Sequence, residues 1–152
     1  MGFFNKIKKT VSAGRDELAK QVGRFKNQKF MQATVATCAY VAMASDGVSS
    51  EEKQKMIGFL QTSDELKVFD TTEVITFFNK IISSYEFDME IGKGEAMKYI
   101  VALKSQPDAA QLSVRVGIAV AKSDGDFDVY EQQAVKEVIQ SLELKLADFG
   151  MN

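Results

Sequence analysis

The stretch that decides the fold spans residues 107–142 and runs PDAAQLSVRVGIAVAKSDGDFDVYEQQAVKEVIQSL. Its first half opens at Pro107, a residue that suits the first position of a helix. Ser123-Asp124-Gly125 ends that half, because glycine after the last periodic residue favours a left-handed helix end. The second half opens with Asp128 and Glu131, which have the spacing of a capping box. Apolar residues recur at helical spacing, so two helices joined by an acidic turn are predicted. The apolar residues at this spacing are Leu112, Val116, Ala119, Val120, Val135, Val138, Ile139 and Leu142.

The same helix signals and short turns extend through the rest of the chain. A helix is expected over about residues 29–45. Residues 73–78 are rich in β-branched and aromatic side chains, so a strand competes there, but residues 74–85 keep a helical period. The expected starts of the intervening helices are Ser49, Asp70, and either Asp88 or Lys93. We therefore expect an all-α, single-domain bundle of about seven helices, the first of them in an N-terminal arm.

The turn at residues 123–125 has a counterpart earlier in the chain. Residues 42–47, AMASDG, align with residues 120–125, VAKSDG. Beyond the shared glycine, one inserted residue brings Glu52 opposite Glu131. The two helix pairs therefore predict an internal pseudo-twofold repeat.

The composition excludes several kinds of chemistry. The chain has 152 residues, no histidine and one cysteine, Cys38. A Ser-His-Asp triad, a Cys-His nucleophile pair, a zinc site of the usual ligands and an intramolecular disulfide are thereby excluded. Ion binding must use carboxylates, hydroxyls and amides. Cys38 lies in the middle of an expected helix among apolar residues, which predicts a buried, inert thiol.

The charges divide the chain into a basic amphipathic arm, residues 1–28, and an acidic all-helical domain, residues 29–152. Residues 1–30 carry eight positive and two negative charges, whereas the remainder carries eleven positive and nineteen negative charges. Such an arm suits an anionic membrane surface, an acidic partner or the chain's own acidic domain, and the acidic domain argues against nucleic acid. The arm residues expected to make these contacts are Lys6, Lys8, Lys9 and Arg15.

Targeting signals are not apparent in the sequence. The first 30 residues contain no continuous apolar segment of a secretory signal, and no window approaches the run of about 20 apolar residues that a spanning helix needs. We therefore expect a cytoplasmic protein, peripheral at the inner membrane through its arm.

The acidic turn of residues 124–131 is the sharpest candidate site. Its alternating carboxylates are typical of the start of a calcium loop, but Val129 replaces the glycine and Val135 the bidentate glutamate of an EF-hand. A shorter oxygen site for a divalent hard cation (Ca²⁺, Mg²⁺ or Mn²⁺) stays open. The alternative is that these residues only stop and cap helices. The candidate metal ligands are Asp124, Asp126, Asp128 and Glu131, with Asp46 and Glu52 of the first turn as a poorer copy.

A second acidic group lies at residues 86–95. It either joins the acidic turns in one acidic face or forms a solvated interhelical loop with its apolar residues tucked in. Its carboxylates are Glu86, Asp88, Glu90 and Glu95, and its apolar residues are Phe87, Met89 and Ile91.

Over essentially its whole length the chain resembles the TerB family of tellurite-resistance proteins. The resemblance rests on Ala44-Ser45-Asp46-Gly47 through Glu52, Phe87-Asp88 with Gly94-Glu95-Ala96, and Lys122-Ser123-Asp124-Gly125 through Glu131. It implies an all-helical fold of two similar halves, a role in bacterial tolerance to tellurite and related stresses, and no established catalytic activity. It also implies partners among other Ter proteins, including the membrane protein TerC and calcium-binding TerD-like proteins. The acidic positions that it carries over are Asp46, Glu52, Asp88, Glu95, Asp124 and Glu131.

The charge split and the duplicated acidic turn predict a non-enzymatic adaptor, and the resemblance implies that it acts in tellurite resistance and the stress response. Its acidic face would bind a divalent cation or a basic partner, and its basic arm would dock on a membrane or a partner. The alternative is a direct metalloid-handling enzyme or a thiol-based redox protein that uses Cys38.

Overall fold

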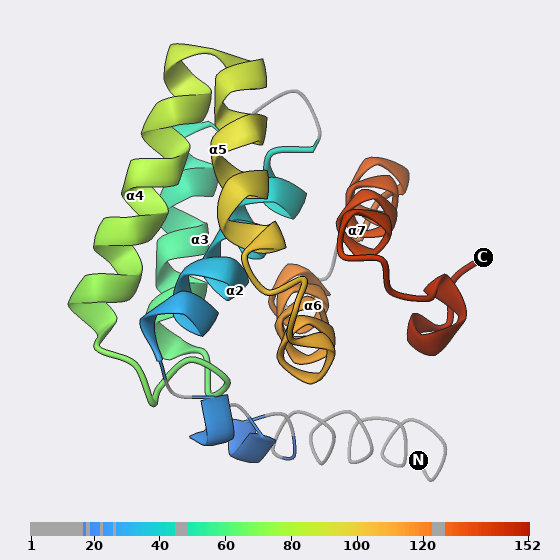
Figure 1. The fold of residues 1–152 in the computed structure, drawn as a ribbon. Coiled ribbons are helices and arrows are strands. Elements are labelled where there is room, and N and C mark those ends of the chain that lie inside the picture. Colours follow the sequence, from blue (N-terminus) through green and yellow to red (C-terminus); the bar gives the residue numbers. More distant parts are fainter. Residues whose placement is uncertain (1–16, 18, 22, 26, 45–48, 123–126) are drawn as a thin grey trace, which may run out of the picture.

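A computed structural model describes residues 17, 19–21, 23–25, 27–44, 49–122 and 127–152. Within these residues the chain is helical and contains no strand, so the expected all-α class is confirmed and the alternative strand at residues 73–78 is wrong (Figure 1). The α-helices are α2 (Gln28–Ala42), α3 (Ser50–Thr62), α4 (Thr71–Phe87), α5 (Met89–Val101), α6 (Pro107–Lys122) and α7 (Val129–Ser141). Two short 3-10 helices, η1 (Gly23–Phe25) and η2 (Leu146–Phe149), complete the described elements.

Helix α2 is the centre of the bundle. It contacts α4, α5, α6 and α7, and Figure 1 shows α3 and α4 on one side of it and α6 and α7 on the other. Its Phe30, Val35 and Val41 side chains are completely buried. Helix α6 approaches α2 closely at Gly117, where a Cβ atom would lie 2.6 Å from Cγ2 of Thr37. The small residue at this crossing therefore allows α2 and α6 to pack closely against each other.

Side-chain caps fix where the helices begin. The Asp70 carboxylate accepts a hydrogen bond from the Glu73 amide at 3.1 Å, and the Asp88 carboxylate accepts one from the Ile91 amide at 3.0 Å. The fifth helix therefore starts after Asp88 and not at Lys93, and Pro107 is the first residue of α6 as predicted. Each cap satisfies an amide that the helix itself leaves unpaired.

The first acidic turn lies mostly outside the described residues. The structure describes neither residues 45–48 nor the side chain of Glu52, so the equivalence of Glu52 with Glu131 stays a prediction. The Lys53 amide does donate to the Ser49 carbonyl at 2.9 Å, which fits a helix that begins there. Helices α3 and α7 each have 13 residues, but the pseudo-twofold relation between the two pairs also stays a prediction.

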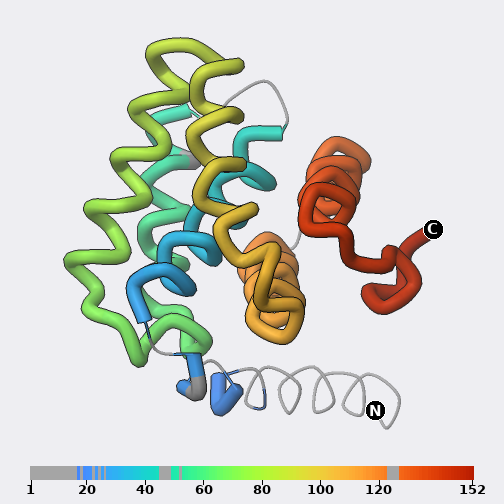
Figure 2. Tube along the Cα trace, in the orientation of Figure 1, coloured from blue at the N-terminus to red at the C-terminus, as the bar shows by residue number. Residues whose placement is uncertain are grey.

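The described end of the N-terminal arm joins the core. Residues 17 and 19–21 are helical, and the ring of Phe25 stacks on that of Phe30 at 5.8 Å between centroids. Figure 2 shows this part of the trace beside the start of α2. The contact residues expected in the arm, Lys6, Lys8, Lys9 and Arg15, lie outside the described residues. Of the helices that are described, none is long and apolar enough to cross a membrane.

Candidate functional site

In the second acidic turn, the described carboxylates cap a helix. The Asp128 carboxylate accepts a hydrogen bond from the Glu131 amide at 2.8 Å, and the Glu131 carboxylate accepts one from the Asp128 amide at 3.3 Å. This pair is the predicted capping box of α7, which satisfies two amides at the helix start. Asp124 and Asp126 lie outside the described residues, so the structure does not test the loop as a metal site.

The other predicted metal ligands are only partly described. Asp88 is exposed and caps α5, and Glu95 is partly buried on the same helix. Asp46 and the side chain of Glu52 are outside the described part of the chain. Among the residues that are described, no group of three or more acidic or cysteine side chains is placed to hold a metal ion. A metal centre at these positions therefore remains a prediction that depends on the two Asp-Gly turns.

Residues 86–91 form a corner between α4 and α5 that is both acidic and apolar, and we call it the acidic corner. The side chains of Phe87 and Ile91 are 80% and 52% exposed. The alternative of a loop with tucked-in apolar residues is wrong, because Asp88 caps the start of α5, no loop separates the two helices, and the apolar side chains are exposed. Its remaining residues, Glu86, Asp88, Met89 and Glu90, are exposed as well.

The charges of the acidic corner are weakly neutralised by neighbouring lysines. Lys53 lies 3.7 Å from Glu86, and Lys93 lies 3.9 Å from Glu90. Exposed pairs at such distances contribute little to stability and leave the carboxylates accessible. An exposed phenylalanine and isoleucine among accessible carboxylates are suited to bind a basic, amphipathic segment.

The single thiol is unsuited to chemistry. Cys38 is 2% exposed in the middle of α2, and burial raises its thiol pKa to about 12, with a further contribution from the charge of nearby Glu65. Since the thiolate is the nucleophile and the metal ligand, a raised pKa and burial both oppose reaction of this thiol. The predicted burial of the cysteine is confirmed, and its inertness stays a prediction.

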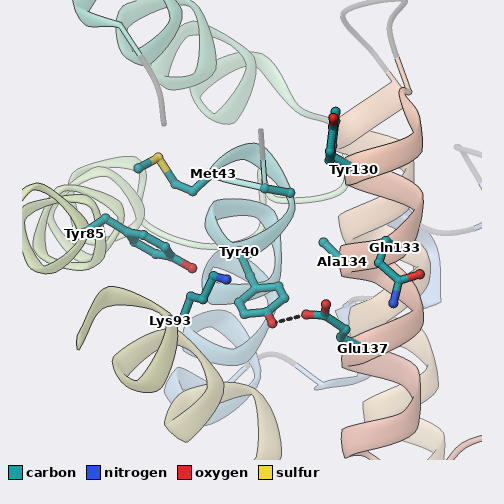
Figure 3. Close-up of a pocket in the computed structure, with 9 residues that line it drawn as sticks. Tyr40, Met43, Tyr85, Lys93, Tyr130, Gln133, Ala134 and Glu137 are labelled. Atoms are coloured by element: carbon teal, nitrogen blue, oxygen red, sulfur yellow. Dashed lines mark hydrogen bonds between the residues drawn. The ribbon is translucent and has the colours of Figure 1, made fainter. Parts of the chain in front are cut away.

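A pocket lies between α2, α4, α5 and α7. It has a volume of about 150 Å³. Figure 3 shows that the hydroxyl of Tyr40 donates a hydrogen bond to a carboxylate oxygen of Glu137, and that Tyr85 and Lys93 face the same space. The remaining lining residues are Met43, Ala44, Tyr130, Gln133 and Ala134.

The two inner tyrosines of this pocket have perturbed acidities. Burial raises the pKa of Tyr85, and the nearby Tyr40 and Glu137 act in the same direction. The pKa of Tyr40 is likewise raised, first by burial and then by its hydrogen bond to the carboxylate of Glu137. Both hydroxyls therefore stay protonated as hydrogen-bond donors at neutral pH.

Sequence reasoning did not find this pocket. Its residues come from α2, from the consecutive helices α4 and α5, and from the distant α7, so no local spacing joins them all. The available signal was that three of the four tyrosines, Tyr40, Tyr85 and Tyr130, fall within expected helices.

Comparison with known proteins points to one family. The family model described as "Tellurite resistance protein TerB" matches residues 31–151. A relative from Alcaligenes sp, named "Tellurium resistance protein TerB", is 70% identical over 118 residues, which cover 78% of this chain and 97% of the relative. No solved structure matches the chain.

Proposed function

This chain belongs to the TerB family of tellurite-resistance proteins, and from that premise we propose that it contributes to tellurite resistance as a non-enzymatic adaptor. In this proposal, the acidic corner binds a basic segment of a partner, the Asp-Gly turns hold a divalent cation, and the basic arm docks on a membrane or a partner. The partners proposed are other Ter proteins, among them the membrane protein TerC.

The observation that carries the adaptor function is the exposure of the acidic corner. Phe87 is 80% exposed at the end of a helix, although most of the large apolar side chains that the structure describes are in the core. Burial of apolar surface releases about 25 cal/mol for each Å², and the surrounding carboxylates would steer a basic partner to it. The alternative function through Cys38 is disfavoured, because its thiol is buried and its pKa is raised to about 12.

A defined peptide tests the acidic corner. The probe is a labelled peptide of residues 1–16, which carries four basic residues among apolar ones. The full chain should bind it at low salt and release it at high salt. The variant Phe87→Ser with Glu90→Gln should bind it at least fivefold more weakly. The control Glu143→Gln changes an exposed carboxylate that pairs with Lys104 elsewhere and should bind normally. Equal binding by all three proteins would contradict the proposal.

A titration tests the cation. Addition of Ca²⁺ or Mn²⁺ to the full chain should shift or broaden the amide signals of Gly47 and Gly125, with the larger effect at Gly125. The double variant Asp124→Asn, Asp128→Asn should abolish the response while it keeps α7 capped, because asparagine caps as well as aspartate. Flat signals at millimolar ion would show that the turns do not bind cations.

Vesicles test the basic arm. The full chain should sediment with vesicles that contain anionic lipid and stay in solution with neutral vesicles. A variant with Lys6, Lys8, Lys9 and Arg15 changed to glutamine should lose this binding. If it sediments as well as the parent chain, the arm does not dock on membranes.

A further inference from the structure

We propose that the pocket between α2, α4, α5 and α7 binds a small oxyanion that retains an O–H group, a chemistry that tellurite and inorganic phosphate share at neutral pH. This site goes beyond the adaptor function, because none of the described residues of the acidic corner and none of the predicted metal ligands that the structure describes lines it. Only the choice of tellurite as a probe rests on the family assignment.

The first observation is a buried hydroxyl without a partner. Tyr85 is 4% exposed, and among the described residues its hydroxyl oxygen has no hydrogen-bond partner. Figure 3 shows this hydroxyl directed into the pocket. A buried hydroxyl that stays unpaired is destabilising, because it has lost its hydrogen bonds to water without replacing them. A ligand bound in the pocket would therefore supply the hydrogen-bond partner that this hydroxyl lacks.

The second observation is that the packing holds Tyr85 in place. Helix α5 touches α4 at Gly92, where a Cβ atom would lie 2.4 Å from Cγ and 2.5 Å from Cα of Tyr85. The absence of a side chain at Gly92 lets the two helices meet and fixes the ring between them. A rigidly placed donor loses little entropy when it binds a ligand.

The charges around the pocket select the ligand. Lys93 lines the pocket and supplies a cationic donor, whose ammonium also lies 3.9 Å from the carboxylate of Glu90. Glu137 uses one carboxylate oxygen to accept the hydrogen bond from Tyr40, and a carboxylate has further acceptor positions. A bare cation would be attracted by Glu137 but not by Lys93, and an anion without a proton would be attracted by Lys93 but not by Glu137, so neither satisfies both side chains. An anion with an O–H group can direct its charged oxygens to Lys93 and Tyr85 and its proton to Glu137.

The size of the pocket limits the ligand to a small molecule. Its volume of about 150 Å³ is well above the roughly 10–15 Å³ that one water molecule requires by the same kind of measure. It is below the roughly 300–1,000 Å³ of pockets that hold drug-sized ligands. Exposed Tyr130 and Gln133 lie at its rim, so the ligand can enter from solvent.

Calorimetry with three salts tests the proposal on the full chain at pH 7. The probes are sodium tellurite alone, inorganic phosphate alone, and sulfate, which has no O–H group at this pH. We expect tellurite, phosphate or both to bind, and sulfate to bind at least tenfold more weakly. If tellurite binds and phosphate does not, the site is specific for the metalloid anion. If phosphate binds, the site is a general oxyanion site. No binding of either anion at 10 mM, or equal binding of sulfate, would overturn the proposal.

Matched variants locate the binding. Tyr85→Phe should weaken binding by at least tenfold, because it removes a hydrogen bond to a charged group. Its fold should be kept, since the substitution removes an unpaired buried hydroxyl. Lys93→Gln, at a partly exposed position, should weaken binding similarly. The control Tyr99→Phe removes a hydroxyl that accepts from Lys80 at 2.9 Å outside the pocket and should bind like the parent chain. Unchanged binding by both Tyr85→Phe and Lys93→Gln would refute the assignment of this site.

Discussion

Replacement of Gly92 by alanine tests how α4 and α5 are held together. The added Cβ would lie 2.5 Å from Cα of Tyr85 and 2.4 Å from its Cγ. Contacts with Cα cannot be relieved by a change of rotamer, so the two helices must move apart. Overpacking of this kind costs about 1–3 kcal/mol, or more when backbone is displaced.

Helix propensity opposes this cost. Alanine is favoured over glycine inside a helix by about 1 kcal/mol, so we expect Gly92→Ala to reduce the free energy of unfolding by about 1–2 kcal/mol. Gly94→Ala is the matched control in the same helix, because no atom lies within 4 Å of its added Cβ. This control should gain up to about 1 kcal/mol from propensity alone.

Urea denaturation of the three proteins measures the difference. The midpoint should fall for Gly92→Ala and rise for Gly94→Ala, with the slope of the transition unchanged. A Gly92→Ala protein as stable as the Gly94→Ala protein would refute the close packing of α5 on Tyr85. It would also remove one support of the proposed oxyanion pocket.

Three further predictions follow from the contacts described above. Asp128→Ala should lower the free energy of unfolding by about 1 kcal/mol, whereas Asp128→Asn should change it little, since asparagine also caps a helix; equal losses in urea denaturation would contradict the capping box. Cys38 should react with iodoacetamide at pH 8 very slowly in the folded protein and rapidly in urea, because its thiol pKa is raised to about 12; fast labelling of the folded chain would contradict its burial. Tyr40 and Tyr85 should stay protonated above pH 10.0, the ordinary tyrosine value from which burial raises each pKa. The folded state then binds more protons than the unfolded state, so the free energy of unfolding should fall as pH rises above that value. A free energy of unfolding that does not change with pH, together with phenolate absorbance of all tyrosines near pH 10.0, would contradict the raised pKa values.

Most helix starts could be predicted because their signals are local. Each capping aspartate bonds to an amide three residues further along the chain, and Pro107 acts through its own backbone angle. The signals for these helix starts are therefore contained in a short stretch of sequence. The start of α5 was ambiguous because Gly92 and Gly94 weaken a helix on propensity alone. Gly92 instead serves the contact with Tyr85, which belongs to another helix. Propensity cannot anticipate such a tertiary requirement.

The candidate sites were less predictable for related reasons. A carboxylate such as Asp128 has the same spacing whether it caps a helix or binds an ion, so the motif alone left both alternatives open. The exposure of Phe87 depends on how sharply α4 meets α5, which its apolar character did not reveal. The pocket was missed because Tyr40, Tyr85 and Glu137 meet only after distant helices have packed.

Tellurite tolerance of cells that carry variants of this chain with the other Ter proteins tests the adaptor function most directly. The triple variant Glu86→Gln, Phe87→Ser, Glu90→Gln changes only exposed side chains of the acidic corner. It should fold normally and lose tolerance, whereas Cys38→Ser should keep it. Full tolerance with the triple variant and loss of tolerance with Cys38→Ser would contradict the adaptor function and favour chemistry at the thiol.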